Sequence, residues 1–156
     1  QLARDNIMNK FKKNGIDSNK IIFMERLKSY EDHLKLYNKI DISLDTFPFA
    51  GATTTFESLW MGVPTITLSG EIFNSKFGVS INKNLNLNNF IAKDKIDYIE
   101  KAKIICSDFK RLSQIRQSLR NLAINSVLFD NKNLGLDLCK ILKDKWNLYS
   151  KQNKNL

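Results

Sequence analysis

Residues 41–68 constrain the fold of this chain more than any other stretch of its sequence. Two short β-rich runs, Asp41–Leu44 and Pro64–Leu68, enclose a turn of glycine and threonine and a segment with helical spacing. This order predicts parallel strands joined by a right-handed crossover, with ligands bound at the carboxyl ends of the strands. We therefore expect an α/β fold.

The turn Gly51-Ala-Thr-Thr-Thr55 lies where a helix of about residues 54–61 should begin, and Gly62 is expected to end that helix. The first N–H groups of a helix have no partner within it and lie at the positive end of its dipole, so they attract anions. The candidate phosphate ligands are Gly51, Thr53, Thr54 and Thr55. Helix capping is the alternative role for the threonines, although three in succession exceed what a single cap requires.

Glu57 follows in the first turn of the same predicted helix. Its carboxylate could accept hydrogen bonds from the two hydroxyls of a ribose. The alternative is a carboxylate that only complements the helix dipole, which contributes under about 1 kcal/mol. A phosphate site beside a ribose site indicates a nucleotide ligand.

The run from Leu44 to Gly70, LDTFPFAGATTTFESLWMGVPTITLSG, resembles the signature of the O-GlcNAc transferase family. This family includes the Spindly-type and the bacterial high-molecular-weight-adhesin glycosyltransferases. Further similar segments are Gly15-Ile-Asp, Ile21-Ile-Phe, Glu31-Asp-His-Leu, residues 73–80, residues 126–130 and Trp146. The resemblance therefore extends over nearly the whole chain.

The resemblance implies a Rossmann-like parallel sheet flanked by helices, the C-terminal nucleotide-binding half of a GT-B glycosyltransferase. Residues 1–150 would form this domain, incomplete at its N-terminus, and residues 151–156 a frayed tail. The implied activity is an inverting, metal-independent transfer of a GlcNAc-like sugar or hexose from a UDP-sugar to a protein side chain. The implied partners are the UDP-sugar donor, the protein acceptor, an absent N-terminal catalytic half and helical repeats.

The resemblance also implies roles for individual residues. Thr53 and Thr54 match the positions that hold the pyrophosphate, Glu57 matches the acidic position that binds ribose, and His33 matches a histidine that contacts the nucleotide. Lys76 stands where the family has an arginine and could reach a phosphate. The acceptor site and general base belong mainly to the half that we expect to be missing, so no catalytic residue is assigned. The chain alone is expected to be inactive.

The composition leaves two other functions open. The chain has 25 Lys and Arg against 16 Asp and Glu, a net charge of +9, which suits a basic RNA-associated module. The basic residues are mostly scattered lysines, however, and recognition of nucleic acid usually relies on clustered arginine or interleaved aromatic residues, so nucleic-acid binding is the weaker interpretation. A domain that keeps the fold but has lost catalysis, and that binds UDP weakly or not at all, is the other alternative.

Cysteine spacing and hydropathy indicate whether to expect a metal site, which redox compartment the chain occupies, and whether it spans a membrane. Cys106 and Cys139 are isolated from each other and from His33, and no Asp-x-Asp pair occurs, so no metal site is predicted. Their apolar neighbours favour reduced, half-buried thiols of a cytoplasmic protein. No apolar run approaches the length of a membrane span.

The remaining patterns predict further elements. Trp60 and Trp146 are expected to be core anchors. Ser29 is expected to cap a helix that ends near Lys39. A strand is expected at residues 21–24, and helices at residues 2–13, 72–81, 91–105, 109–123 and 134–146.

Overall fold

The computed structural model describes residues 2–25 and 27–152. It divides the chain into two units, residues 1–35 and residues 36–156. The first contains helix α1 (Leu2–Lys13), a 3₁₀ turn (Ser18–Lys20) and helix α2 (Tyr30–Lys35). The predicted first helix is confirmed, and Gly15 follows it with φ of +76°, a left-handed conformation that glycine adopts readily.

The predicted strand at residues 21–24 is wrong, because these residues form no strand. The backbone of Ile21 is extended, as its β-branched side chain favours, and the side chain of Ile22 is 81% exposed. A strand requires hydrogen bonds from a neighbouring strand as well as an extended backbone. The local sequence pattern indicated only the extended backbone and not a neighbouring strand.

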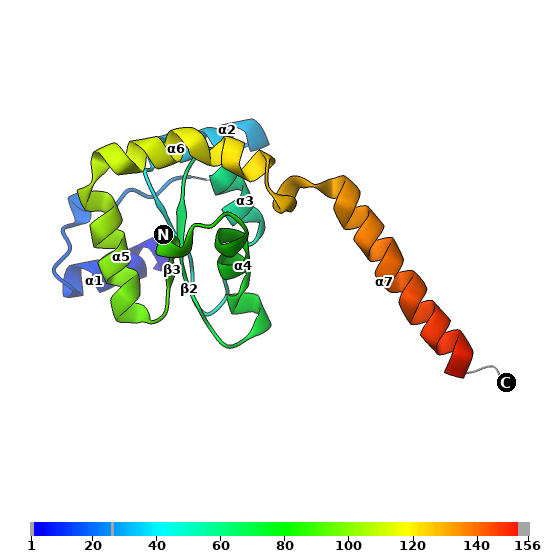
Figure 1. The fold of residues 1–156 in the computed structure, drawn as a ribbon. Coiled ribbons are helices and arrows are strands. Elements are labelled where there is room, and N and C mark those ends of the chain that lie inside the picture. Colours follow the sequence, from blue (N-terminus) through cyan, green and yellow to red (C-terminus); the bar gives the residue numbers. More distant parts are fainter. Residues whose placement is uncertain (1, 26, 153–156) are drawn as a thin grey trace. The chain divides into compact units, whose positions relative to one another are not determined.

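The second unit holds the sheet and its helices (Figure 1). Its strands are β1 (Ser43–Leu44), β2 (Thr65–Leu68) and β3 (Ile91–Ala92). Its α-helices are α3 (Thr53–Trp60), α4 (Phe77–Asn84), α5 (Lys95–Ser107), α6 (Phe109–Ile124) and α7 (Asn131–Gln152). Its 3₁₀ segments are Leu36–Lys39, Phe73–Ser75, Asn88–Phe90 and Val127–Phe129.

The three strands form a parallel sheet in the order β1-β2-β3. Ser43 pairs with Thr65, and Thr67 pairs with Ile91. Helices α4 and α5 both contact β2 and β3, and Figure 1 shows them on either side of these strands. The parallel sheet flanked by helices confirms the predicted α/β fold, and its carboxyl edge carries the loops that follow each strand.

Two predicted helices have different bounds in the structure. Residues 91–105 were expected to be one helix, but Ile91 and Ala92 pair with β2 and α5 begins only at Lys95. Asp94 caps α5 by accepting a hydrogen bond from the Asp97 amide at 2.8 Å. Residues 72–81 likewise divide at Lys76 into a 3₁₀ turn and α4.

The core of the second unit lies between α3, α4 and α6. Its buried cluster consists of Leu59, Ile81, Leu85, Leu119 and Ala123, with Phe56, Leu87, Leu128 and Phe129 packed against it. Gly62 ends α3 with φ of +72°, as its position predicted, and a Cβ there would lie 2.9 Å from the Arg116 carbonyl oxygen. The absence of a Cβ at Gly62 therefore allows the end of α3 to approach α6 this closely.

Three predictions about apolar residues have different outcomes. Trp60 is half-buried, so its predicted role as a core anchor holds only in part; the Arg120 guanidinium lies 4.2 Å from its ring centroid, and the Phe129 ring stacks with it. Trp146 is 67% exposed on α7, so its predicted role as a core anchor is wrong. Cys106 is half-buried as expected, but Cys139 is exposed on α7. Amphipathic spacing predicted the helix but not which surface covers its apolar face.

The last described residues belong to α7. Lys151 and Gln152 continue α7, whereas residues 153–156 of the predicted frayed tail lie outside the described residues. Among the described helices, none combines the length and apolar character needed to cross a membrane.

Candidate nucleotide-binding site

The turn of residues 51–55, the threonine turn, leads from the loop after β1 into α3. The N-cap residue is Ala52, whose methyl side chain cannot accept a capping hydrogen bond. The Phe56 amide donates to the Ala52 carbonyl at 3.1 Å. The amides of the first turn come before Phe56 in the chain and have no carbonyl partner within the helix. They form the positive end of α3, at the carboxyl edge of the sheet where the sequence predicted an anion site.

The three threonines of this turn have different surroundings. Thr53 and Thr54 are exposed, and their hydroxyls lie on the first turn of α3. Thr55 is 2% exposed, and its hydroxyl donates to the Gly51 carbonyl at 2.8 Å. The exposed pair can therefore meet a ligand, while the hydroxyl of Thr55 holds the turn together.

Glu57 is half-buried one turn into α3. The hydroxyl of Tyr37 lies 3.3 Å from Glu57 Oε2 and 3.3 Å from the Thr54 carbonyl oxygen. Tyr37 comes from the 3₁₀ segment Leu36–Lys39, so a residue 20 positions away orients this carboxylate. An oriented carboxylate beside a helix N-terminus suits the recognition of a diol next to a phosphate.

A second loop, which follows β2, adjoins the threonine turn. The Ala50 amide donates to the Asn74 carbonyl at 3.0 Å and joins the two loops. Ser75 is buried and its hydroxyl donates to the Ile72 carbonyl at 2.7 Å, whereas Lys76 is exposed at the start of α4. The structure thus gives Lys76 an open side chain on a loop bonded to the predicted site.

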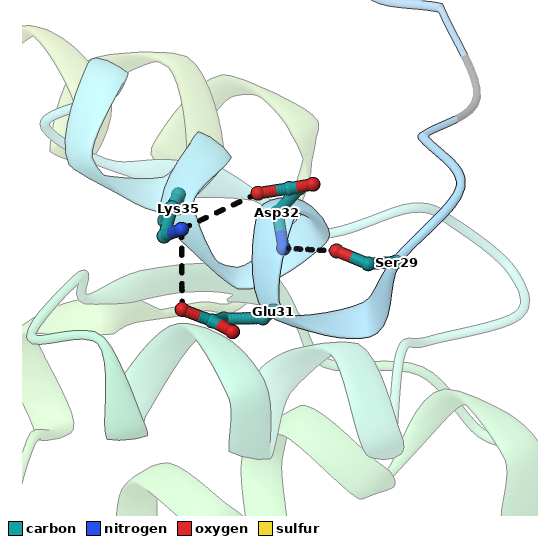
Figure 2. A network of polar contacts seen from close by, with 4 residues as sticks. All are labelled: Ser29, Glu31, Asp32 and Lys35. Carbon is teal, nitrogen blue, oxygen red and sulfur yellow. Dashed lines mark hydrogen bonds and ion pairs between the residues drawn. The ribbon is translucent and has the colours of Figure 1, made fainter.

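His33 belongs to the first unit and is exposed in the six-residue helix α2. As predicted, Ser29 caps this helix, because its hydroxyl oxygen accepts the Asp32 amide at 3.0 Å (Figure 2). Lys35 lies 3.1 Å from a Glu31 oxygen and 3.3 Å from an Asp32 oxygen. Hydrogen bonding by Ser29 and the Lys35 ion pair lower the pKa of Asp32, and Glu31 raises the pKa of Lys35.

A cavity of about 360 Å³ lies beside the loop after β1. It is lined by Asp45, Phe47, Leu68, Lys95, Tyr98 and Ile99. The Tyr98 hydroxyl donates to the Asp45 carbonyl at 2.9 Å, and burial and then the Asp45 charge raise the pKa of Tyr98 to about 12. A second cavity, of about 400 Å³, lies between α5 and α6 and contains none of the predicted site residues.

The structure gathers Gly51, Thr53, Thr54, Thr55 and Glu57 on one turn and the helix that follows it. Sequence reasoning missed Tyr37, whose contact with Glu57 has no local signal. It also gave no role in the site to Asp45, whose carboxylate accepts the Gly51 amide and the Thr67 hydroxyl of β2. The combination of an aspartate at a strand end and a Gly-Thr turn shortly after it was the available clue to Asp45.

Comparisons with known proteins identify the family of this chain. The model of glycosyl transferase family 41 matches residues 2–138. A probable UDP-N-acetylglucosamine–peptide N-acetylglucosaminyltransferase SPINDLY of Solanum lycopersicum is 38% identical over 135 residues, which are 86% of this chain and 14% of the relative. The corresponding Caenorhabditis elegans UDP-N-acetylglucosamine–peptide N-acetylglucosaminyltransferase is 28% identical over 135 residues, 86% of this chain and 12% of its own length.

A solved structure shows the same fold. A mutant of the Thermobaculum terrenum O-GlcNAc transferase superposes with a TM-score of 0.79 and 26% sequence identity, covering 90% of this chain and 28% of that structure. This chain therefore spans a small part of the proteins that it matches. The match over residues 2–138 and the shared fold confirm the resemblance seen in the sequence: the chain belongs to glycosyl transferase family 41, with the O-GlcNAc transferases.

Proposed function

We propose that this chain is the donor-binding portion of an inverting glycosyltransferase. Its donor is a UDP-sugar carrying a GlcNAc-like sugar or a hexose, and its acceptor is a protein side chain. The observation that carries the proposal is the open first turn of α3, with the exposed Thr53 and Thr54 beside the oriented Glu57. Relatives named as peptide N-acetylglucosaminyltransferases support both the donor and the acceptor class.

Each residue has a specific task in this proposal. The first-turn amides of α3 and the hydroxyls of Thr53 and Thr54 bind the pyrophosphate, while Thr55 and Gly51 shape the turn. Glu57 accepts hydrogen bonds from the ribose. Lys76 neutralises a phosphate oxygen, and His33 contacts the nucleotide.

The proposed chemistry relies on charge stabilisation. As the bond between sugar and phosphate breaks, negative charge grows on the leaving UDP. Amides and hydroxyls that already point to this charge stabilise it more than they stabilise the bound donor, which lowers the barrier. Because a helix N-terminus supplies this stabilisation, the transfer is proposed to need no divalent ion.

Calorimetric titration of the chain with UDP tests the proposal. We expect saturable binding that prefers UDP over inorganic pyrophosphate and persists in the presence of a metal chelator. Dependence on a divalent ion would contradict metal-independent binding. The absence of UDP binding would favour a domain that has lost its ligand.

The basic RNA-associated module makes a different prediction for the same titration. It would bind RNA with a steep salt dependence and without preference for UDP over other polyanions. A titration with a short RNA at two salt concentrations therefore separates the two functions. We expect the RNA signal to vanish at moderate salt while UDP binding remains.

A further inference from the structure

The carboxylate of Asp45 connects the loop after β1, the threonine turn and β2. Its Oδ1 accepts the Gly51 amide at 2.7 Å and the Thr46 amide at 2.9 Å. Its Oδ2 accepts the Thr67 hydroxyl at 2.8 Å. The side chain therefore links the threonine turn to β2, and Asp45 itself directly follows β1.

The main chain of Asp45 is held as firmly as its side chain. Its amide donates to the Ile66 carbonyl at 2.9 Å, and its carbonyl accepts the Tyr98 hydroxyl at 2.9 Å. Asp45 is thus attached to β2 twice and to α5 once. A carboxylate fixed in this way can determine where the Gly51 amide lies.

Two glycines leave space around this carboxylate. A Cβ on Gly78 would lie 2.6 Å from Asp45 Oδ2 and 2.5 Å from Thr67 Oγ1, so α4 begins directly against this pair. A Cβ on Gly51 would lie 2.4 Å from Thr54 Oγ1 and 3.4 Å from Asp45 Oδ1. The Thr54 hydroxyl therefore packs on the backbone atom next to the amide that Asp45 holds, and displacement of Gly51 displaces Thr54.

We propose that Asp45 is a positioning residue for the nucleotide: it holds the Gly51 amide so that Thr53 and Thr54 face the pyrophosphate. This inference rests on the proposed function. It also assigns the Gly51 amide to Asp45 and leaves anion binding to the amides and hydroxyls that follow. A carboxylate this close to the turn would by itself repel an anion, so charge and positioning predict opposite effects of its removal.

The test compares UDP binding by calorimetry in Asp45→Ala, Asp45→Asn and the wild type. Asp45→Ala should weaken UDP binding about tenfold or more, because the turn loses a hydrogen bond to a charged acceptor. Asp45→Asn keeps an oxygen that can accept the Gly51 amide, and it should stay within about threefold of the wild type. Asp144→Ala, which removes an exposed carboxylate from α7, is the control for net charge and should bind as the wild type does.

The rate of hydrogen exchange at the Gly51 amide is a second readout. This rate should increase in Asp45→Ala and remain low in Asp45→Asn. Equal or tighter UDP binding by Asp45→Ala would overturn the inference, as would an equal loss in the two variants. If Asp45→Ala does not fold, Thr67→Val decides: it removes one anchor of the carboxylate and should weaken UDP binding severalfold, and unchanged binding would overturn the inference. A wild type that binds no UDP would instead refute the proposed function itself.

Discussion

At the scale of single residues, Glu57 carries the sharpest distinction between a functional and a structural role. It lies on the first turns of α3, and the Tyr37 hydroxyl is close to both its carboxylate and the Thr54 carbonyl. A carboxylate that only complements the helix dipole needs no such orientation. The contact with Tyr37 therefore favours a carboxylate that is prepared for a ligand.

Replacement of Glu57 by Gln should reduce UDP affinity by about 1–3 kcal/mol, because a neutral acceptor replaces a charged one at the ribose hydroxyls. Calorimetry with UDP and with 2′,3′-dideoxy-UDP measures this effect. The wild type should prefer UDP, and Glu57→Gln should lose most of that preference. Glu100→Gln, an exposed carboxylate on α5, serves as the matched control. Equal discrimination by Glu57→Gln and the wild type would leave Glu57 as a helix-dipole residue.

At the scale of elements, the threonine turn separates ligand contacts from structural contacts within three consecutive residues. Thr53 and Thr54 are exposed at the start of α3, whereas the buried Thr55 bonds the Gly51 carbonyl. On this one turn, the side chains of Thr53 and Thr54 thus face solvent, and the side chain of Thr55 faces the protein. Mutations in this turn should therefore divide in the same way.

The double variant Thr53→Val, Thr54→Val should weaken UDP binding by about 1–3 kcal/mol and leave the free energy of unfolding within about 0.5 kcal/mol of the wild type. Thr55→Val should instead lower the free energy of unfolding by about 1 kcal/mol, because the Gly51 carbonyl loses its donor. Calorimetric titration and urea unfolding measure the two quantities. Unchanged UDP affinity in the double variant would restrict these threonines to a structural role.

At the scale of the whole molecule, we expect Tyr98 to make the stability of the second unit decrease at alkaline pH. Its hydroxyl joins α5 to the end of β1, and its pKa is about 12 against an ordinary value of 10. A pKa raised in the folded state means that the neutral phenol is favoured there. The corresponding stability is complete below about pH 10 and is lost as the pH rises through about 12.

Urea unfolding of the wild type and Tyr98→Phe at several pH values tests this dependence. At neutral pH the wild type should be more stable, because Tyr98→Phe lacks the bond to the Asp45 carbonyl. The difference should shrink as the pH rises above 10. Ionisation of the Tyr98 phenol then favours the unfolded wild type, and Tyr98→Phe has no phenol to ionise. Tyr149→Phe, on the exposed helix α7, should show no such change. A difference that stays constant with pH would contradict the prediction.

The sequence by itself determined the elements whose signals lie within a few neighbouring residues. Ser29 caps α2, Gly62 ends α3, and the Gly-Thr turn precedes α3, as capping and turn chemistry predicted. The alternation of strands and helices predicted the parallel sheet, because parallel strands require crossovers. The long run around the threonine turn also carried the family resemblance, which the comparisons confirm.

Only the tertiary structure decided the features that depend on distant partners. Ile91 and Ala92 form a strand because β2 lies beside them, whereas residues 21–24, predicted from the same kind of local pattern, form none. The carboxylate of Asp45 meets Gly51 six residues away and Thr67 22 residues away, and its carbonyl meets Tyr98 53 residues away. Local propensity contains no information about such contacts, because they form only when the sheet and its helices pack together.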